Sequence, residues 1–384
     1  MRVLLHCTYY PPEVGGLESH VAELARGLVE AGHEVRVVTS LSMPGLPAEE
    51  VVDGVRVRRT PLPTRSGIGW VLHALGSLGI TRRWARWADV VHAQAFASVF
   101  PCALAARSAR RPLVATFHTS HFLVRAQRAL WRPILGWLVR RPDHSLAASH
   151  EIAEVAMGLA PGVGVEALTN GVDTDRFRRI ETAEGDVPPL AEGERRILVP
   201  RRLFHKNGVE HFVRAMPAIL RDEPQARAWL IGDGPERERL EALARELELG
   251  EALRFLGRRA HDEMPALLSS GELAVFPSLM EATSVAALEC MACELPVVAT
   301  RVGGLPEIVD DSVGRLVPPA DPDALARGVL ELLRVPELRE MGERARERVV
   351  SAWSNERLVA RHVEIYRELG ADGVERIDAG EVRS

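Results

Sequence analysis

Short apolar runs alternate with helical patterns along the chain, and this alternation limits the possible folds more than any other feature. The first half has short strand-like runs at residues 3–7, 34–39, 89–92, 113–117 and 145–148, and the alternating Val-Arg-Val-Arg-Arg at 55–59 is consistent with a further strand at an edge. The second half repeats the pattern at residues 196–200, 226–231, 253–256, 273–276 and 296–299. Strands alternating with helices predict parallel sheets that are covered on both faces.

The chain has 384 residues, enough for about two domains of ordinary size. The segment between the two halves is rich in Glu, Gly and Pro, which is typical of a linker. We therefore predict an α/β protein with two doubly wound units. They are residues 1–180 and 195–354, joined by a linker at 181–194 and followed by a helix and tail at 355–384. Because such sheets bind ligands beyond the carboxyl ends of their strands, the cleft between the units is the expected site.

Composition excludes several classes of function. A net charge of −5 gives no support for nucleic-acid binding. No apolar run approaches the ~20 residues that span a bilayer, and the N-terminus lacks a signal-peptide pattern. Four scattered cysteines favour a reducing cytoplasm over a disulfide framework. Cys290 and Cys293 have the spacing of two zinc ligands but lack suitably placed partners, so we expect no metal.

A basic loop follows the strand at 196–200 and contains Lys206, the single lysine among 48 cationic residues. A chain that otherwise uses arginine keeps lysine where a compact ammonium is needed. Arg202 and Lys206 could together neutralise charge that develops on a diphosphate leaving group. The alternative interpretation is a solvated basic loop.

Two glutamates, Glu281 and Glu289, stand eight residues apart after the strand at 273–276. Thr283 and Ser284 are both good N-caps, so a helix is expected to begin there. The free N–H groups of its first turn suit a diphosphate, and Glu289 could accept hydrogen bonds from ribose hydroxyls. The alternative is a capped helix with an incidental glutamate.

The first half carries two weaker signals. Gly15 and Gly16 precede a helix and would let backbone approach a phosphate or sugar, although the G-x-G-x-x-G fingerprint is absent. His118 follows the strand at 113–117 and would point into the expected cleft. A lone histidine is otherwise most often structural.

Together with LTNGVDTDRF at 168–177, GDGP at 232–235 and TRVGGLPEI at 300–308, these motifs resemble retaining glycosyltransferases of family 4, in the family's order. There are two departures. The family's Arg-Leu-x-x-x-Lys-Gly reads RLFHKNG at 202–208, with lysine one place early and Asn207 in its slot. The family's Glu-Gly-Phe-Gly reads EATS at 281–284, whose hydroxyls would add donors for the phosphates.

The resemblance implies the GT-B fold, with two Rossmann-like domains and a C-terminal helix that packs back on the first. It implies transfer of a sugar from a nucleotide diphosphate sugar to a hydroxyl acceptor, without cofactor or metal. His118, Arg202, Lys206 and Glu281 would act at the sugar and diphosphate. The other donor contacts implied are Gly15, Gly16, Gly232, Arg258, Thr283, Ser284, Val285 and Glu289.

Several alternatives stay open at this point. A nucleotide-sugar epimerase of the same fold and a non-catalytic nucleotide-sugar binding protein both fit the motifs. The base, the sugar and the acceptor are not separable from the sequence. The stretch from Arg125 to Arg141 combines five arginines with two tryptophans. It predicts either peripheral contact with the inner face of the cell membrane or a packed helix whose arginines reach solvent.

Overall fold

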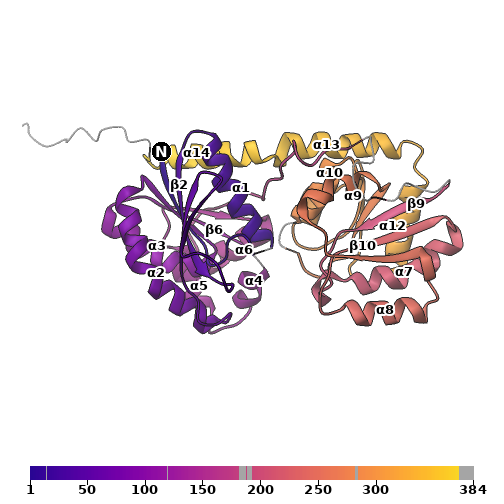
Figure 1. The fold of residues 1–384 in the computed structure, drawn as a ribbon, viewed down its shortest axis with the longest axis horizontal. Coiled ribbons are helices and arrows are strands. Elements are labelled where there is room, and N and C mark those ends of the chain that lie inside the picture. The colour runs from indigo at the N-terminus through magenta and orange to yellow at the C-terminus, as the bar shows by residue number, and fades with distance from the viewer. Residues whose placement is uncertain (14, 119, 181–186, 188–192, 282–283, 372–384) are drawn as a thin grey trace, which may run out of the picture. The chain divides into compact units, whose positions relative to one another are not determined.

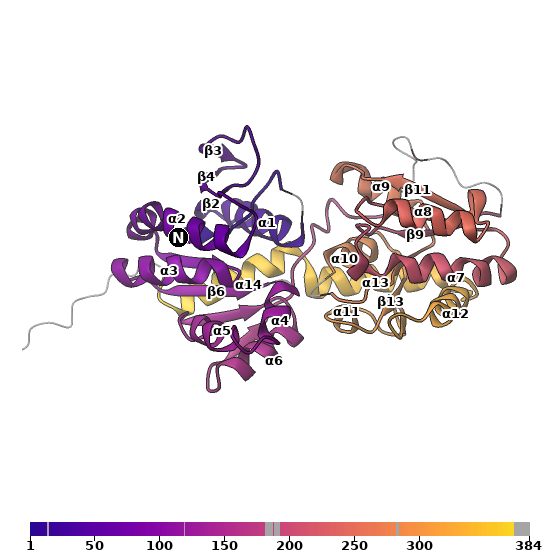
Figure 2. The same cartoon turned by 90° about the horizontal axis from the view of Figure 1, so that it is seen from below.

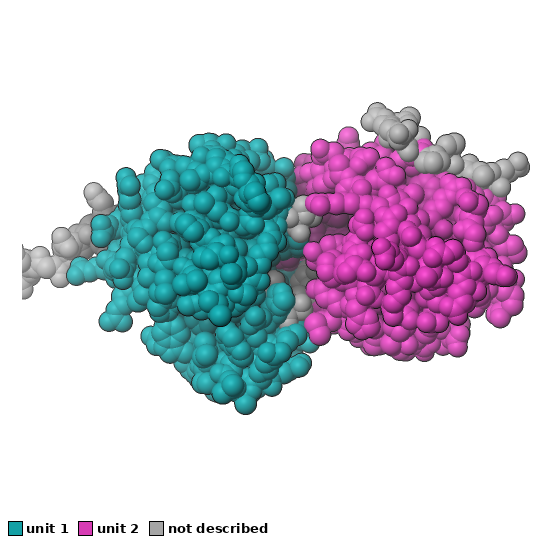
Figure 3. All heavy atoms as spheres, turned by 60° about the horizontal axis from the view of Figure 1, so that its bottom comes forward, with its two compact units in different colours: residues 1–169, 356–384 teal, residues 170–355 magenta. Residues whose placement is uncertain are grey.

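The computed structural model describes residues 1–13, 15–118, 120–180, 187, 193–281 and 284–371. The described residues form two compact units, one from residues 1–169 with 356–371 and one from residues 170–355 (Figure 3). Each unit is a sheet flanked by helices on both faces (Figures 1 and 2). The predicted architecture of two parallel α/β domains is confirmed.

The sheet of the first unit has, in its described residues, the strand order β3-β4-β2-β1-β5-β6-β7-β8. Neighbouring strands are parallel except β3 and β4, which form an antiparallel pair. The order reverses between β1 and β5. The strands are β1 (Arg2–His6), β2 (Glu34–Leu41), β3 (Glu49–Val52), β4 (Val55–Pro61), β5 (Val90–Gln94), β6 (Leu113–Phe117), β7 (His144–Ala147) and β8 (Val165–Ala167).

The helices of the first unit cover both faces of its sheet. One face packs against α1 (Gly16–Glu30) and α14 (Asn355–Glu368), which share a core with β1, β2 and β5. The other carries α2 (Gly67–Trp87) and α3 (Phe96–Ala109), which pack against each other (Figure 1). The remaining helices are α4 (Ser120–Ala126), α5 (Arg132–Val139) and α6 (His150–Leu159). The predicted return of the C-terminal helix onto the first unit is therefore confirmed.

The sheet of the second unit is parallel, with the order β11-β10-β9-β12-β13-β14 in its described residues. Because side chains alternate along a strand, Ile197 and Val199 enter one core and Leu198 enters the other. The strands are β9 (Arg195–Val199), β10 (Ala226–Ile231), β11 (Leu253–Gly257), β12 (Leu273–Phe276), β13 (Val297–Thr300) and β14 (Gly314–Val317).

Helices of the second unit divide between these two cores. The core of Ile197 includes α7 (Val209–Asp222), α8 (Arg237–Glu246) and α12 (Pro322–Leu333). The core of Leu198 includes α9 (Met264–Ser269), α10 (Val285–Ala292), α11 (Leu305–Ile308) and α13 (Leu338–Trp353). The short 3-10 helices are η1 (His205–Asn207), η2 (Gly250–Ala252) and η3 (His261–Glu263).

The second unit begins at residue 170, earlier than the predicted end of the first unit at residue 180. Val172 forms a β-bridge with Ser354, and the ring of Phe177 is buried in the core of Leu198. Arg346 of α13 also donates a hydrogen bond to the carbonyl of Phe177 (2.9 Å). These contacts attach residues 170–180 to the second unit. Most of the predicted linker at 181–194, and the tail from 372, lie outside the described residues.

Candidate functional site

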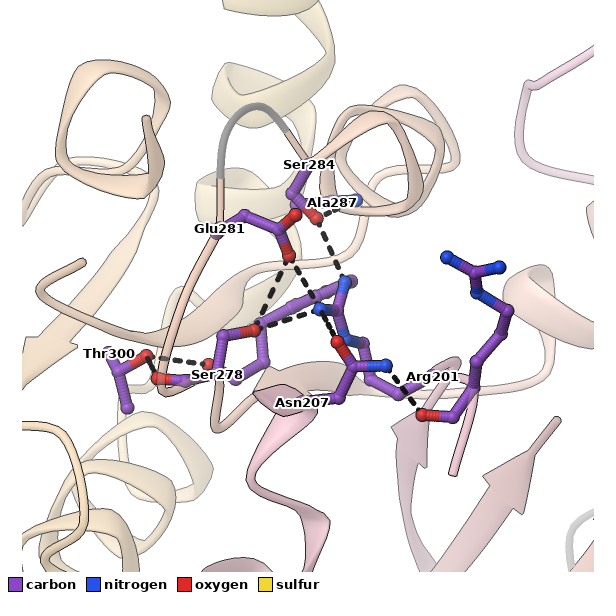
Figure 4. Close-up of polar contacts among 9 residues, drawn as sticks. Arg201, Asn207, Ser278, Glu281, Ser284, Ala287 and Thr300 are labelled. Carbon is purple, nitrogen blue, oxygen red and sulfur yellow. Dashed lines mark hydrogen bonds and ion pairs between the residues drawn. The ribbon is translucent and has the colours of Figure 1, made fainter. Parts of the chain in front are cut away.

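The strand order of the second unit reverses between β9 and β12, so the loops that leave these two strands diverge from a common edge. This reversal is where open α/β sheets bind ligands. Residues 200–208 follow β9, and residues 277–284 follow β12. Both predicted motifs of this unit are therefore brought to one place (Figure 4).

The side chain of Arg201 joins the two loops. Its Nη2 donates to Oε2 of Glu281 (2.5 Å), Oγ of Ser278 (3.0 Å) and Oδ1 of Asn207 (2.9 Å). Its Nη1 lies 3.4 Å from Oγ of Ser284, the N-cap of α10 (Figure 4). Only 9% of the Arg201 side chain is exposed. One buried guanidinium thus positions the first glutamate, both loops and the start of α10.

Asn207 stands where the family resemblance would place a lysine, and it has a different task. Its side chain is buried, and Nδ2 donates to the carbonyl of Arg202 (2.6 Å). The backbone carbonyl of Lys206 accepts from the N–H groups of Leu279 (2.8 Å) and Met280 (3.2 Å). These bonds fix the backbone of the basic loop against the loop after β12, while the side chain of Lys206 stays exposed.

The charges at this edge are unbalanced. Although Lys206 as a residue is exposed, the protein around its ammonium excludes part of the water, and this partial desolvation lowers the pKa of Lys206 from its usual range. The carboxylate of Glu281 opposes this shift, whereas the guanidinium groups of Arg202 and Arg201 add to it. Three cations therefore lie within electrostatic reach of one another beside the Glu281 carboxylate. A multiply charged anion would relieve their repulsion.

Two glycines allow neighbouring loops to approach this site. A Cβ on Gly232, which has φ +146°, would lie 2.2 Å from the carbonyl oxygen of Arg201. A Cβ on Gly303, which has φ +54°, would lie 1.8 Å from the carbonyl oxygen of Glu281. Any larger residue would push these backbones apart, so the glycines hold Arg201 and Glu281 in position.

The helix expected after Glu281 is α10, and its first residue is Val285. Ser284 caps it by accepting from the N–H of Ala287 (3.4 Å), whereas Thr283 lies outside the described residues. Glu289 lies in its second turn, and its Oε1 is 2.9 Å from Nε2 of His261 in η3. Arg201 contacts both Glu281 and Ser284, so the N-terminus of α10, with the positive end of its dipole, lies beside Glu281.

The other predicted residues of this unit lie as follows. Gly232 directly follows β10, the neighbour of β9. Arg258 is exposed after β11, which is two strands away from β9 in the sheet. Sequence reasoning gave no role to Arg201, Asn207 or Ser278. The one signal for Arg201 was its place in the basic loop, and nothing there separated it from Arg202.

In the first unit, the predicted residue His118 lies at the end of β6, beside the helix that the predicted glycines precede. The ring of His118 lies 4.8 Å from the ring of His20 on α1, the helix that begins at Gly16 with Gly15 as its N-cap. Nε2 of His118 donates to Oε1 of Gln94 (2.8 Å). Burial, aided by His362, lowers the pKa of His118 to about 3, so its imidazole is neutral near pH 7.

Among the described residues, no cluster of three or more His, Cys, Asp or Glu side chains could hold a metal ion. Cys290 and Cys293 are both buried in the core of Leu198. None of the helices in this part of the chain is long and apolar enough to cross a bilayer.

Comparison with known proteins places this geometry in a family. Residues 14–176 match Glycosyltransferase Family 4, and residues 182–348 match Glycosyl transferases group 1. A glycogen synthase of Mycobacterium tuberculosis is 30% identical over 95% of this chain and 94% of that protein. The chain belongs to glycosyltransferase family 4.

Solved structures share the fold. Sucrose-phosphate synthase from Thermosynechococcus elongatus has a TM-score of 0.85 at 24% identity, covering 96% of this chain and 99% of that one. Anabaena HepE in complex with UDP-glucose has a TM-score of 0.76 at 19% identity, covering 96% and 100%. The two units thus have the GT-B fold that the motifs implied.

Proposed function

We propose that this protein is a retaining glycosyltransferase that moves a sugar from a nucleotide diphosphate sugar to a hydroxyl acceptor. The main observation behind this proposal is that three cations, Arg201, Arg202 and Lys206, lie together where the strand order of the second sheet reverses. They lie beside the N-terminus of α10. That arrangement suits a diphosphate. The structure of Anabaena HepE with UDP-glucose supports a donor of this class.

In the proposed reaction, the bond between the anomeric carbon and the phosphate oxygen breaks while negative charge grows on the diphosphate. Arg202, Lys206 and the first N–H groups of α10 would stabilise that charge, which is the work a divalent cation does elsewhere. Glu281, held by Arg201, would accept hydrogen bonds from sugar hydroxyls. Glu289 would do the same for the ribose.

The acceptor hydroxyl would attack the face from which the diphosphate departs, so the configuration at the anomeric carbon is retained. A bond forms from the acceptor oxygen to the anomeric carbon, and the proton of the hydroxyl passes to the departing phosphate oxygen. Positioning of both reactants supplies most of the rate. Neutral His118 would contact a hydroxyl of the sugar.

The test begins with thermal unfolding in the presence of UDP, GDP and ADP sugars. A donor at 100 times its Kd should stabilise the protein by about 2.7 kcal/mol. The donor found is then incubated with candidate acceptors, with and without EDTA. We expect a product of retained anomeric configuration, formed equally well in EDTA. Glu281→Gln should slow its formation by about 10²–10³.

Each rival function gives a different result in this test. Isomerised donor in the absence of an acceptor would identify an epimerase. Tight binding without turnover, unaffected by Glu281→Gln, would identify a binding protein. No stabilisation by any nucleotide sugar would overturn the proposal.

The proposed function includes contact between the first unit and an anionic membrane surface. Three apolar side chains near and on α5 are exposed at helical spacing, Leu130 (87%), Ile134 (50%) and Trp137 (40%). Exposed arginines flank them at 128, 132, 140 and 141. A basic amphipathic surface of this kind partitions to negatively charged lipid.

Not every arginine of the 125–141 stretch supports this contact. Arg125 is only partly exposed and stacks on Trp70 (4.9 Å) and Trp131 (5.2 Å), whereas exposed Arg141 lies over the ring of Trp137 (4.3 Å), within the proposed contact surface. Pro133 stands in the first turn of α5, so the stretch is divided between the end of α4 and α5. The proposed membrane contact is therefore confined to residues 128–141.

A further inference from the structure

A chain of buried polar side chains in the first unit leads from α14 to His118. The hydroxyl of Tyr366 lies 2.7 Å from Nδ1 of His92, and Nε2 of His92 lies 2.8 Å from Oγ1 of Thr116. Nε2 of Gln94 is 3.3 Å from the same His92 nitrogen, and Oε1 of Gln94 accepts from His118 (2.8 Å). His92, Gln94 and His118 are each at most 2% exposed.

The hydrogen bond to Gln94 determines which nitrogen of His118 carries the proton. An amide oxygen can only accept, so Nε2 of His118 must be the donor. A neutral imidazole has one N–H, and its second nitrogen, Nδ1, then carries a lone pair. Nδ1 is therefore an acceptor.

The groups that face His118 keep it neutral. They are His20 on α1, His362 on α14 and, beyond Gln94, His92 on β5. All are buried histidines, and burial lowers the pKa of each. Charging any of them would place an imidazolium among other imidazoles with little solvent, which favours the neutral forms near pH 7.

We infer that Gln94 is a positioning residue that fixes His118 in the Nε2–H tautomer, so that Nδ1 accepts a hydrogen bond from a substrate hydroxyl. This inference rests on the proposed function, in which His118 contacts the sugar. It adds the residue that sets the direction of that hydrogen bond. A structural role alone would require Gln94 only to satisfy a buried imidazole.

The first test needs no turnover. Protein labelled with ¹⁵N-histidine is studied by NMR, and His118→Asn identifies the His118 signals. We expect neutral His118 with Nε2 protonated in the wild type, and a mixture of tautomers in Gln94→Met. A wild-type His118 protonated at Nδ1 would overturn the inference.

The second test measures kcat and KM with the donor and acceptor found for the enzyme. In metal sites, loss of the partner that fixes a histidine tautomer lowers metal affinity or activity about 10–100-fold. We therefore expect Gln94→Met to lower kcat about tenfold with KM within about twofold. In a protein that already carries His118→Asn, Gln94→Met should lower kcat no further, because Gln94 acts through His118. An equal loss in both backgrounds would overturn the inference.

Ser98→Ala is the matched control for this cycle. It removes a buried hydrogen bond to another histidine of the same sheet, His6 (3.0 Å), and should leave kcat unchanged. Thermal unfolding of every variant separates lost folding from lost positioning. A loss of kcat in Ser98→Ala equal to that in Gln94→Met would overturn the specific role of Gln94.

Gln94→Glu gives a readout that a structural role would not produce. A carboxylate at this place raises the pKa of His118, and an imidazolium donates from Nδ1 instead of accepting. We expect wild-type kcat to be flat between about pH 6 and pH 8, and the variant's kcat to fall as pH decreases. A variant with a flat profile would contradict the inference.

Failure of this inference and of the proposed function are distinguishable. If His118 shows the expected tautomer but no nucleotide sugar is turned over, the proposed function fails and the tautomer assignment stands. If transfer is found and Gln94→Met keeps the full rate, the role of Gln94 fails and the proposed function stands.

Discussion

Nη2 of Arg201 lies 2.5 Å from Oε2 of Glu281, and this ion pair joins the loops that follow β9 and β12. The two residues are 80 positions apart in the chain. Their side chains are only 9% and 15% exposed, so water screens the pair weakly. The position of Glu281, the first glutamate of the motif, is therefore set by a cation in the loop that follows the neighbouring strand β9.

Loss of Arg201 should destabilise the second unit. Removing one partner of a buried ion pair leaves an uncompensated charge, and for this partly buried pair we expect Arg201→Met to cost about 3 kcal/mol. The double variant Arg201→Met/Glu281→Gln should recover much of that loss, because both charges are gone. Urea unfolding followed by fluorescence of buried Trp229 measures both. Strictly additive losses would mean that the pair is not coupled.

Lys206 should impose an alkaline limit on activity. Its ammonium must stay protonated to stabilise the diphosphate, and partial desolvation together with the two arginines lowers its pKa from 10.5. Donor kcat/KM should therefore fall as pH rises, at a pH below that of an ordinary lysine. Lys206→Arg should remove this alkaline fall in kcat/KM, because a guanidinium keeps its proton in this pH range.

A kinetic profile between about pH 7 and pH 10 tests the assignment of Lys206. Lys206→Met should lower kcat/KM by about 10²–10³. Arg214→Ala, which removes an exposed cation of α7, is the matched control and should leave the profile unchanged. An alkaline limb that persists in Lys206→Arg would assign the titration to another group.

The fold was predictable wherever strands are buried, because continuous apolar runs mark them. β3 was missed, since Glu49–Val52 is mostly exposed and offers no apolar run. Its available signal was the turn Asp53-Gly54, whose residues both have positive φ (49° and 76°), as a two-residue hairpin requires. β8 (VEA) and β14 (GRLV) were also missed, because a charged residue interrupts each of them and leaves no continuous apolar run.

The site was predictable at the level of motifs but not of side-chain direction. Arg201 and Arg202 are adjacent arginines in one loop, and local sequence does not tell which of them turns inward. The partners that decide this, Ser278 and Glu281, come from the loop after β12, far along the chain. Gln94 was likewise hidden at the end of an apolar run. Its contact with His118 depends on the pairing of β5 with β6.

The buried histidines of the first unit should make the protein acid-sensitive. Burial lowers the pKa of His118 to about 3, and of His73 and His362 to about 4. The unfolded chain binds protons near pH 6.5, whereas the folded chain binds them only near pH 3–4. Stability is therefore full above about pH 6.5 and is lost as pH falls below it.

At pH 5 each of these three histidines should lower the free energy of unfolding by about 2 kcal/mol relative to pH 7.5. Denaturant unfolding at the two pH values measures the loss. His362→Gln should reduce it by about 2 kcal/mol, whereas the exposed His205→Gln should leave it unchanged. A free energy of unfolding that does not change between the two pH values would show that these imidazoles are not held neutral.

The proposed membrane contact predicts selective binding to anionic vesicles. We expect the wild type to float with vesicles of phosphatidylglycerol, not with vesicles of phosphatidylcholine, and to be released by about 1 M salt. Ile134→Glu or Trp137→Glu removes apolar burial and adds repulsion, so each should weaken partitioning about tenfold. Met157→Glu changes another exposed apolar residue of the first unit, on α6, and should bind as the wild type does. If all three substitutions weakened vesicle binding equally, the change in net charge would explain the effect. Residues 128–141 would then have no special role.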